Sequence, residues 1–197
     1  MRVISGSAKG RKLKAPPGLH TRPITDMIKG ALFNVLGTRV PDSKLLDLFA
    51  GSGSVGIEAL SRGARSVVFV DNSNEAIKIV TENLENCKFT RVYQVIRSDV
   101  FKALGLLKRH DEKFDLIYID PPFTNDKIFD EVMIAIDGID ILEPDGILII
   151  RTPRRKEMPA YNRLREYRLN HYGESSLHYY SRSEEDPKND GNFSHIG

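Results

Sequence analysis

The sequence is poor in cysteine and tryptophan and has no long hydrophobic run. Its 197 residues include one cysteine, Cys87, and no tryptophan. A single cysteine excludes an internal disulfide and any zinc or iron–sulfur centre with several cysteine ligands, so we expect a reducing, cytoplasmic environment. No apolar stretch approaches the roughly 18 residues of a membrane-spanning helix, and the basic segment 1–14 lacks the apolar core of a secretory signal. We therefore expect no membrane partner.

The remaining composition is that of an ordinary globular protein, with 40% hydrophobic and 28% charged residues. This length fits one domain with an arm or a tail, and a chain of this size buries roughly 70% of its extended surface. We divide the chain into a basic N-terminal arm with a helix (1–40), a main domain (41–182) and a disordered tail (183–197). We expect it to act as a monomer.

The net charge of +2 hides an uneven distribution along the chain. Residues 1–40 carry eight basic residues and one acidic residue, and residues 151–182 carry eight basic and three acidic residues. Residues 41–150 instead carry twelve basic and nineteen acidic residues. Such charges can be solvated surface, but basic residues gathered on one face release counterions from a polyanion. This favours a nucleic acid partner, with candidate contacts at Lys9, Arg11, Lys12, Lys14, Arg151, Arg154 and Arg155.

Strand and helix patterns alternate from residue 44 onward. We predict strands at 45–49, 66–70, 92–97, 114–119 and 146–151, and helices at 26–36, 55–61, 74–86, 100–108 and 127–136. This alternation indicates βαβ units and a doubly wound α/β fold, with a mostly parallel sheet covered on both faces.

The end of the chain breaks this alternation. Two further strand patterns, 165–172 and 176–181, flank a short turn and predict an antiparallel hairpin. We expect His171 and His178 to be exposed in this hairpin. Of the neighbouring Tyr179 and Tyr180, we expect one ring in the core and the other free to face nucleic acid.

A glycine-rich turn follows the first predicted strand. Gly51, Gly53 and Gly56 match the G-x-G-x-x-G pattern, and Asp71 ends the next strand. The Asp71 carboxylate can accept hydrogen bonds from both hydroxyls of a ribose, and Asp99 can accept one from an adenine amino group. A strand–turn–helix without a ligand also shows such glycines. However, open α/β sheets bind ligands at the carboxyl ends of their strands, so we predict an adenosine-containing ligand.

Asp47 separates two possible cofactors. A nicotinamide dinucleotide would place its pyrophosphate at a helix N-terminus, where a nearby acid repels it. S-adenosylmethionine has no phosphate and carries a sulfonium and an ammonium group, which suit Asp47 better. The sequence therefore favours S-adenosylmethionine over a dinucleotide.

The motif Asp120-Pro121-Pro122-Phe123 follows a buried strand at its carboxyl end. Prolines fix φ and lack an N–H, so the loop is stiff and its carbonyls are free to accept. The Asp120 carboxylate and the Pro121 carbonyl can each accept one hydrogen of an exocyclic NH2 group, which aims the nitrogen lone pair at a methyl donor. Phe123 offers a face on which a flipped base can stack.

This chemistry needs no metal and no protein nucleophile. The absence of a cysteine near the motif argues against C5-pyrimidine methylation. The alternative is a loop whose prolines only end a strand. The motif predicts methylation of an amino group and leaves the base open.

The chain resembles amino-methyltransferases with a D/N-P-P-Y/F motif, and more closely the bacterial RsmD-type 16S rRNA (guanine-N2)-methyltransferases. The resemblance covers about residues 1–182. It rests on Arg2-Val-Ile-Ser-Gly, Gly10-Arg-Lys-Leu13, Thr21-Arg22-Pro23, Ala31-Leu-Phe-Asn34, Asp47-Leu-Phe-Ala-Gly-Ser-Gly53, Gly56-Ile-Glu58 and the motif at 120–123.

The resemblance implies a seven-stranded Rossmann-like sheet and methyl transfer from S-adenosylmethionine, with S-adenosylhomocysteine as product. The acceptor would be the N2 amino group of a guanine, position 966 of 16S rRNA, in the small ribosomal subunit. Catalysis would involve Asp120, Pro121, Pro122 and Phe123, without a metal. The implied cofactor contacts are Arg22, Asp47, Phe49, Ala50, Gly51, Ser52, Gly53, Asp71, Asn72, Asp99 and Val100. Arg22 would pair with the cofactor's carboxylate.

Two positions depart from the family pattern. Asp71 stands where the family usually has Glu, and Met27-Ile28-Lys29-Gly30 replaces an Arg-x-Arg-Glu run. A DNA adenine-N6 or cytosine-N4 methylase would use the same chemistry, but the chain leaves no room for a sizeable target-recognition domain. A nucleotide dehydrogenase would explain the glycines but not the motif at 120–123. A non-catalytic rRNA-binding assembly factor remains the alternative from another class.

Overall fold

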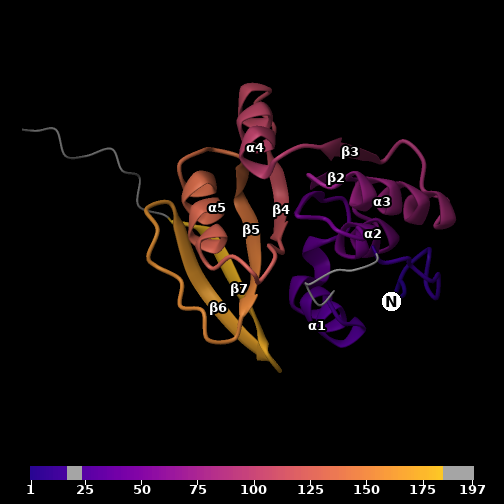
Figure 1. Ribbon diagram of the computed structural model, residues 1–197, viewed down its shortest axis with the longest axis horizontal. Coiled ribbons are helices and arrows are strands. Elements are labelled where there is room, and N and C mark those ends of the chain that lie inside the picture. Colours follow the sequence, from indigo (N-terminus) through magenta and orange to yellow (C-terminus); the bar gives the residue numbers. More distant parts are fainter. Residues whose placement is uncertain (17–23, 184–197) are drawn as a thin grey trace, which may run out of the picture.

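One sheet of seven strands organises the part of the chain that the structure describes, residues 1–16 and 24–183 (Figure 1). The molecule is described from a computed structural model. The strands are β1 Lys44–Leu48, β2 Ser66–Asp71, β3 Tyr93–Arg97, β4 Phe114–Ile119, β5 Leu142–Pro153, β6 Leu164–Tyr172 and β7 Ser175–Arg182. The helices are α1 Asp26–Leu36, η1 Gly37–Arg39, α2 Ser54–Ser61, α3 Asn74–Asn86, α4 Val100–Arg109 and α5 Lys127–Asp137. Arg22 and residues 184–197 of the expected tail lie outside the described residues.

The strand order β3-β2-β1-β4-β5-β7-β6 confirms the predicted doubly wound fold. The first five strands are parallel, and β7 pairs antiparallel with both β5 and β6. The order reverses between β1 and β4, and ligands of open α/β sheets bind at this switch point.

Alternate residues along the central strands pack into two separate hydrophobic cores, one on each face of the sheet. Leu45 of β1 packs with α1, α2 and α3 on one face, and the next residue, Leu46, packs with α4 and α5 on the other. Figure 1 shows these two groups of helices on either side of the sheet. Because both faces are covered, the central strands are nearly continuous hydrophobic runs.

The N-terminal arm shares the first of these cores. An isolated antiparallel bridge joins Arg2 to Lys12, and Val3, Ala8 and Leu13 are buried with α1 and α2. The arm is therefore packed against the main domain and is not a free extension.

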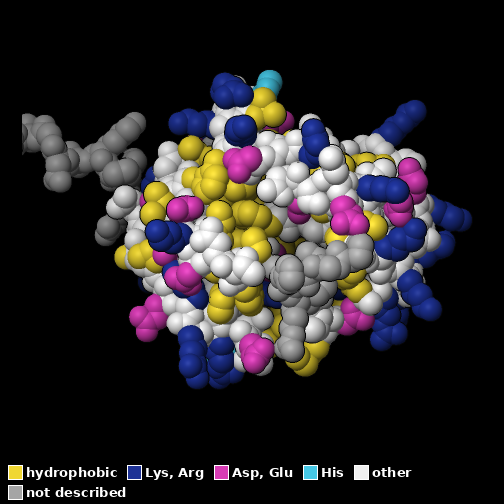
Figure 2. Space-filling view, viewed as in Figure 1, with side chains coloured by type: hydrophobic (Ala, Val, Ile, Leu, Met, Phe, Trp, Pro, Cys, Tyr) yellow, Lys and Arg dark blue, Asp and Glu magenta, His cyan; other side chains and the backbone are white. Residues whose placement is uncertain are grey.

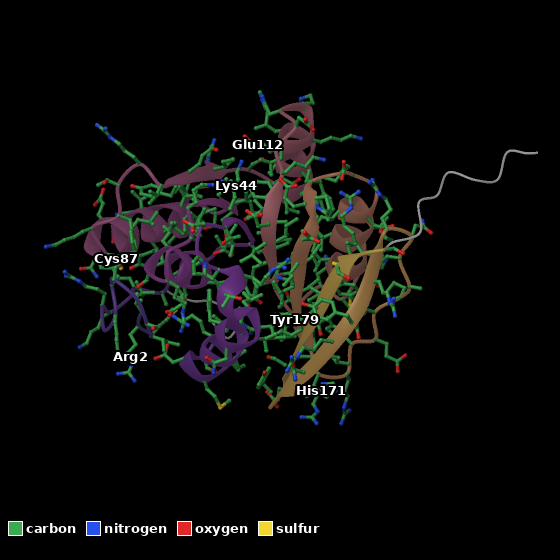
Figure 3. The ribbon with its side chains drawn as sticks, turned by 180° about the vertical axis from the view of Figure 1, so that it is seen from behind. Arg2, Lys44, Cys87, Glu112, His171 and Tyr179 are labelled. Carbon is green, nitrogen blue, oxygen red and sulfur yellow. The ribbon has the colours of Figure 1, made fainter. Side chains whose placement is uncertain are left out.

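The C-terminal hairpin corrects two expectations from the sequence. Tyr179 and Tyr180 are both buried, with 0% and 2% of their surface exposed, and His178 is 3% exposed. The reason is that β7 lies between β5 and β6 and has a core on each face, as an internal strand does. Figure 3 shows Tyr179 among packed side chains and His171 at the outer end of the hairpin. His171 is exposed, as expected.

Strand ends differ from the predicted bounds by a few residues. β1 ends at Leu48, not at residue 49, because Phe49 adopts a left-handed φ of 59° that leaves the pleat. β5 begins earlier than predicted, at Leu142, with a register irregularity opposite β4. None of the described helices is long and apolar enough to cross a membrane.

Candidate active site

The glycine loop, residues 50–56, joins β1 to α2 at the switch point. Gly51 and Gly53 have φ values of 56° and 71°, a region that glycine enters without steric cost. Gly56 has another role, because a Cβ there would lie 2.3 Å from a ring carbon of Phe69. The absence of a side chain at Gly56 lets α2 press against β2.

Two acids at the carboxyl ends of neighbouring strands accept hydrogen bonds from backbone N–H groups, Asp71 at the glycine loop and Asp99 at the start of α4. The Asp71 carboxylate accepts from the Gly51 N–H at 2.9 Å and from the Ser73 N–H at 2.9 Å. Asp99 caps α4 and accepts from the N–H groups of Phe101 and Lys102 at 3.0 and 3.2 Å. Both acids thus lie at the sheet edge where the sequence predicts a ligand.

Asp47 lies beneath the glycine loop, 2% exposed, and not at its surface. Its carboxyl oxygen Oδ2 accepts from the Gly56 N–H in the first turn of α2 at 3.0 Å. Burial raises the pKa of Asp47 well above its usual value; the Gly56 hydrogen bond opposes this shift, and the negative charges of Asp120 and Asp71 add to it. Asp47 therefore fixes the start of α2 through a buried acceptor.

The DPPF loop, residues 120–123, begins directly after β4. The Asp120 N–H donates to the Leu48 carbonyl at 3.2 Å, which joins the DPPF loop to the end of β1. The carboxyl oxygen Oδ2 of Asp120 accepts from the Tyr118 hydroxyl at 3.2 Å and from the Arg151 guanidinium at 3.0 Å. The two predicted motifs, the glycine loop and the DPPF loop, are thus neighbours.

Burial also governs the ionisation of this acid–phenol pair. It raises the pKa of Asp120, while Arg151 and the hydrogen bond from Tyr118 oppose the shift. It raises the pKa of Tyr118 well above its usual range, and the Asp120 carboxylate adds to that effect. The Tyr118 hydroxyl therefore stays protonated and donates to Asp120.

Aromatic contacts fix the end of the DPPF loop. The Phe123 ring meets Phe129 of α5 edge to face, with centroids 5.9 Å apart. The guanidinium carbon of Arg151 lies 5.0 Å from the centroid of the Phe123 ring. Pro121 is buried, whereas Pro122 and Phe123 are half-buried.

The other predicted cofactor contacts occupy different surroundings. Ala50 and Ser52 are buried in the glycine loop, and Asn72 is exposed beyond β2. The side chain of Val100 packs in the core under α4. Phe49 is half-buried with its φ of 59°, a strained backbone for a bulky residue of the kind that gathers at functional sites.

The predicted basic contacts fall into two groups, with one exception. Lys9, Arg11, Lys12 and Lys14 are exposed on the arm, and Figure 2 shows Lys and Arg side chains gathered around the arm and α3. Lys14 also pairs with Glu82 at 2.8 Å. Arg154 and Arg155 are exposed beyond β5.

The exception is Arg151, which the sequence analysis expected on the rim. It is 3% exposed and pairs with Asp120, so its guanidinium does not face solvent as a phosphate contact would. The reason is its position on β5, opposite Leu177 of β7 and two strands in from the edge strand β6.

Two polar residues near these loops, Tyr118 and Lys156, were not predicted from the sequence. Tyr118 lies two residues before Asp120, and the period of two in a strand places both on the same face. Lys156 pairs with Asp126 and Asp130 at 3.2 and 2.8 Å. It borders a cavity of about 370 Å³ that Asp126, Pro153, Arg155 and Glu157 also line. No sequence signal pointed to this cavity, because its two sides come from separate loops.

A metal centre is not evident in residues 1–16 and 24–183, where no group of three or more His, Cys, Asp or Glu side chains is placed to hold an ion. The chemical groups at the switch point are instead backbone amides, carboxylates, prolines and an aromatic ring. Such a set can bind a polar ligand by hydrogen bonds and hold a planar amine beside it.

Comparisons with known proteins agree with this geometry. Residues 1–181 match the family described as "Conserved hypothetical protein 95". The putative rRNA methyltransferase YlbH of Bacillus subtilis is 43% identical over 159 residues, 81% of this chain and 86% of that protein. The ribosomal RNA small subunit methyltransferase D of Escherichia coli is 28% identical over 160 residues, 81% of this chain and 78% of that protein.

A solved structure shows the same architecture. The putative methyltransferase yhhF from Escherichia coli has a TM-score of 0.79 at 28% identity and covers 92% of this chain and 97% of its own. The family match over nearly the whole described chain, the fold and the two joined motifs lead to one conclusion: the chain belongs to the RsmD-type methyltransferase family, described as "Conserved hypothetical protein 95".

Proposed function

We propose that this protein transfers a methyl group from S-adenosylmethionine to the N2 amino group of a guanine in 16S rRNA of the small ribosomal subunit, at position 966. The observation that carries the proposal is the junction of the glycine loop and the DPPF loop, where the Asp120 N–H donates to Leu48. A cofactor held by the glycine loop would lie beside a loop shaped to accept an amine. The names of the Bacillus subtilis and Escherichia coli relatives supply the rRNA substrate class.

The residues at the switch point suit S-adenosylmethionine better than a dinucleotide. The Gly51 N–H donates to Asp71, and the Gly56 N–H at the start of α2 donates to Asp47. Amides that would receive a pyrophosphate are thus already satisfied by carboxyl groups, and further negative charge is unfavourable there. A ligand with cationic groups and no phosphate fits this arrangement.

We assign cofactor binding to the glycine loop, with Asp71 and Asp99 at the adenosine and Arg22 at the carboxylate. When bound, S-adenosylmethionine supplies an electrophilic methyl group and leaves as S-adenosylhomocysteine. The protein's own part is to hold an amino group in line with that methyl. No protein nucleophile is required.

Asp120 and Pro121 hold the amine in this proposal. Both hydrogen bonds to the Asp120 carboxyl from Tyr118 and Arg151 end at Oδ2, so we assign Oδ1 to the amine. The Pro121 carbonyl accepts the second hydrogen, and Phe123 stacks on the flipped base. The nitrogen lone pair then leaves conjugation and points toward the methyl donor.

A test is methyl transfer from labelled S-adenosylmethionine to unmodified small ribosomal subunits, free 16S rRNA and duplex DNA in parallel. The product is digested to nucleosides, and the label is mapped on the rRNA. We expect N2-methylguanosine at position 966 with the subunits. Label in N6-methyladenine or N4-methylcytosine of DNA would instead favour the DNA methylase, and tight cofactor binding without transfer would favour an assembly factor.

A further inference from the structure

Arg151 is a buried charged residue to which the proposed reaction gives no direct role. It lies near the carboxyl end of β5, beside β4, and is 3% exposed. Burying a guanidinium costs several kcal/mol unless charge pairing and hydrogen bonds compensate for it. Its position in the sheet must therefore be explained by what it contacts.

Arg151 contacts both functional side chains of the DPPF loop. Its Nη1 group donates to Asp120 Oδ2 at 3.0 Å, and its guanidinium carbon lies 5.0 Å from the centroid of the Phe123 ring. One planar cation thus holds the carboxyl that is assigned to the amine and the ring that is assigned to the base. A guanidinium suits this double contact because it forms directed hydrogen bonds and also stacks on aromatic faces.

The strand register explains why these groups meet. Asp47 pairs with Tyr118 across β1 and β4, and Tyr118 pairs with Ile149 across β4 and β5. Asp120, directly after the end of β4, follows Tyr118 by two residues, and Arg151 of β5 follows Ile149 by two residues, so both project to the same face as Tyr118 and Ile149. Among the described residues, the charged or titratable groups that face the Asp120 carboxyl are therefore Asp47 of β1, Tyr118 of β4 and Arg151 of β5.

We propose that Arg151 is a positioning residue for methyl transfer, which fixes the Asp120 carboxyl and the Phe123 ring in the orientation that receives the target base. The inference rests on the proposed function. Arg151 acts through Asp120 and Phe123 and does not itself accept the amine or bind phosphate. Fixing Oδ2 leaves the carboxylate one orientation in which to meet the base.

The same contact favours the ionised form of the Asp120 carboxyl, because the Arg151 charge lowers its pKa. Burial raises the pKa of Asp120, and the Arg151 charge opposes that rise. An ionised carboxylate accepts hydrogen bonds at both oxygens, whereas a protonated one donates from one of them. Without Arg151 the pKa of Asp120 should rise further, so the rate of methyl transfer should begin to fall at a higher pH as the solution is acidified.

The experiment compares Arg151→Met, Arg151→Lys and a matched control in the full-length protein. Arg182→Met is the control because Arg182 also lies on a strand and pairs with an aspartate, Asp140, at 2.9 Å. Initial rates of N2-guanine methylation are measured against subunit concentration and pH, and cofactor affinity is measured by calorimetry. Thermal melting identifies any variant that is not folded.

We expect Arg151→Met to lower kcat by about 10²-fold, as for the loss of one preorganised contact, with cofactor affinity within about twofold of the wild type. The acidic limb of its pH–rate profile should move to higher pH. Arg151→Lys keeps the positive charge but loses the planar guanidinium group. The acidic limb of its pH–rate profile should therefore stay in place, while kcat is only partly recovered. Arg182→Met should match the wild type in all these measurements.

A double-mutant cycle separates positioning from general stabilisation. If Arg151 acts through Asp120 and Phe123, Arg151→Met should reduce the rate of an Asp120→Ala enzyme by much less than 10²-fold, because only its contact with Phe123 remains to be lost. A full 10²-fold loss in that background, or a kcat and pH profile of Arg151→Met equal to the wild type, would overturn this inference alone. A wild-type enzyme that never methylates guanine N2 would overturn the proposed function, and this inference with it.

Discussion

Three aspartates near the switch point have different surroundings, and we therefore expect different roles for them. Asp120 is held by Tyr118 and Arg151 near the end of β4, whereas Asp47 is buried under the glycine loop. Asp71 accepts backbone N–H groups from both sides of the site. Their chemistry follows from contacts and burial more than from residue type.

Replacing Asp120 with Ala tests the amine-accepting role. We expect cofactor affinity to be unchanged and turnover to fall by roughly 10²–10³-fold, because one preorganised acceptor is lost. Equilibrium binding of S-adenosylmethionine and single-turnover methylation of subunits measure the two effects. Near-normal turnover would place the active site elsewhere.

Replacing Asp47 with Asn tests the buried carboxyl. Because the folded pKa of Asp47 is raised, the folded state keeps this proton to higher pH than the unfolded state does. The contribution to stability is therefore complete below the usual value of 3.8 and is lost as the pH rises through the raised value. Asn can still accept from Gly56 and does not titrate, so the wild type should lose free energy of unfolding relative to Asp47→Asn as the pH rises from about 4 toward neutrality.

Urea unfolding of both proteins at several pH values checks this prediction. Glu131→Gln is a suitable control, because Glu131 is exposed on α5. A difference between wild type and Asp47→Asn that does not change with pH would show that Asp47 has no raised pKa in the folded state.

At the scale of elements, the arm is held to α1 and α2 by a buried polar network. Glu58, with no exposed surface, accepts from the N–H groups of Ile4 and Ser5 at 2.7 and 3.0 Å and pairs with Arg62 at 2.7 Å. Lys29, equally buried, donates to the Arg2 carbonyl at 2.7 Å and to Ser54. The Lys29 Nζ lies 3.7 Å from the Glu58 Oε2.

Removing Glu58 should destabilise the protein more than removing Lys29. Glu58→Ala removes the counter-ion of buried Lys29 and the acceptor of two part-buried backbone N–H groups, and should cost about 3–5 kcal/mol. Lys29→Met should cost about 1–3 kcal/mol, because Glu58 retains Arg62 and both N–H donors. Burial lowers the pKa of Lys29, which also reduces the cost of losing its charge. Equal losses in denaturant unfolding, or a larger loss for Lys29→Met, would contradict this order.

The exposed face of the arm carries a second prediction at this scale. Neutralising Arg11 and Lys12 to Gln should weaken rRNA binding and reduce the magnitude of its salt slope by about 1–2, while cofactor affinity stays constant. Lys108→Gln with Arg109→Gln provides a matched control, since this pair is exposed at the far end of α4. Binding isotherms at several salt concentrations provide the measurement. An unchanged slope for the arm variant would remove the arm from the RNA interface.

At the scale of the whole molecule, the proposed cofactor site joins both halves of the sheet. The glycine loop follows β1 and the DPPF loop follows β4, and these strands pair at the switch point. A ligand held there should stabilise the folded state as a unit, because the unfolded chain has no such site.

We therefore expect S-adenosylmethionine at about 100 times its dissociation constant to stabilise the protein by about 2.7 kcal/mol. For a domain of this size, that shift raises the melting temperature by roughly 5–10 °C. NAD at the same concentration should leave the melting temperature unchanged. Thermal unfolding followed by circular dichroism measures both, and a larger shift with NAD would favour the dehydrogenase.

The sequence by itself determined the features that depend on short-range pattern. The alternation of strands and helices predicted the doubly wound sheet, and the G-x-G-x-x-G and D-P-P-F spacings marked two loops at the carboxyl ends of strands. Such signals are local, because side-chain periodicity and turn chemistry are set within a few residues.

Only the tertiary structure decided which distant residues meet. Arg151 and Asp120 are 31 positions apart, and the register between β4 and β5 makes the arginine that was expected on the rim a buried partner of Asp120. His178 and Tyr180 are buried because β7 is internal to the sheet, a consequence of strand order that no local pattern contains. Pairing between strands depends on the packing of the whole chain, and this is why these contacts lay beyond the sequence.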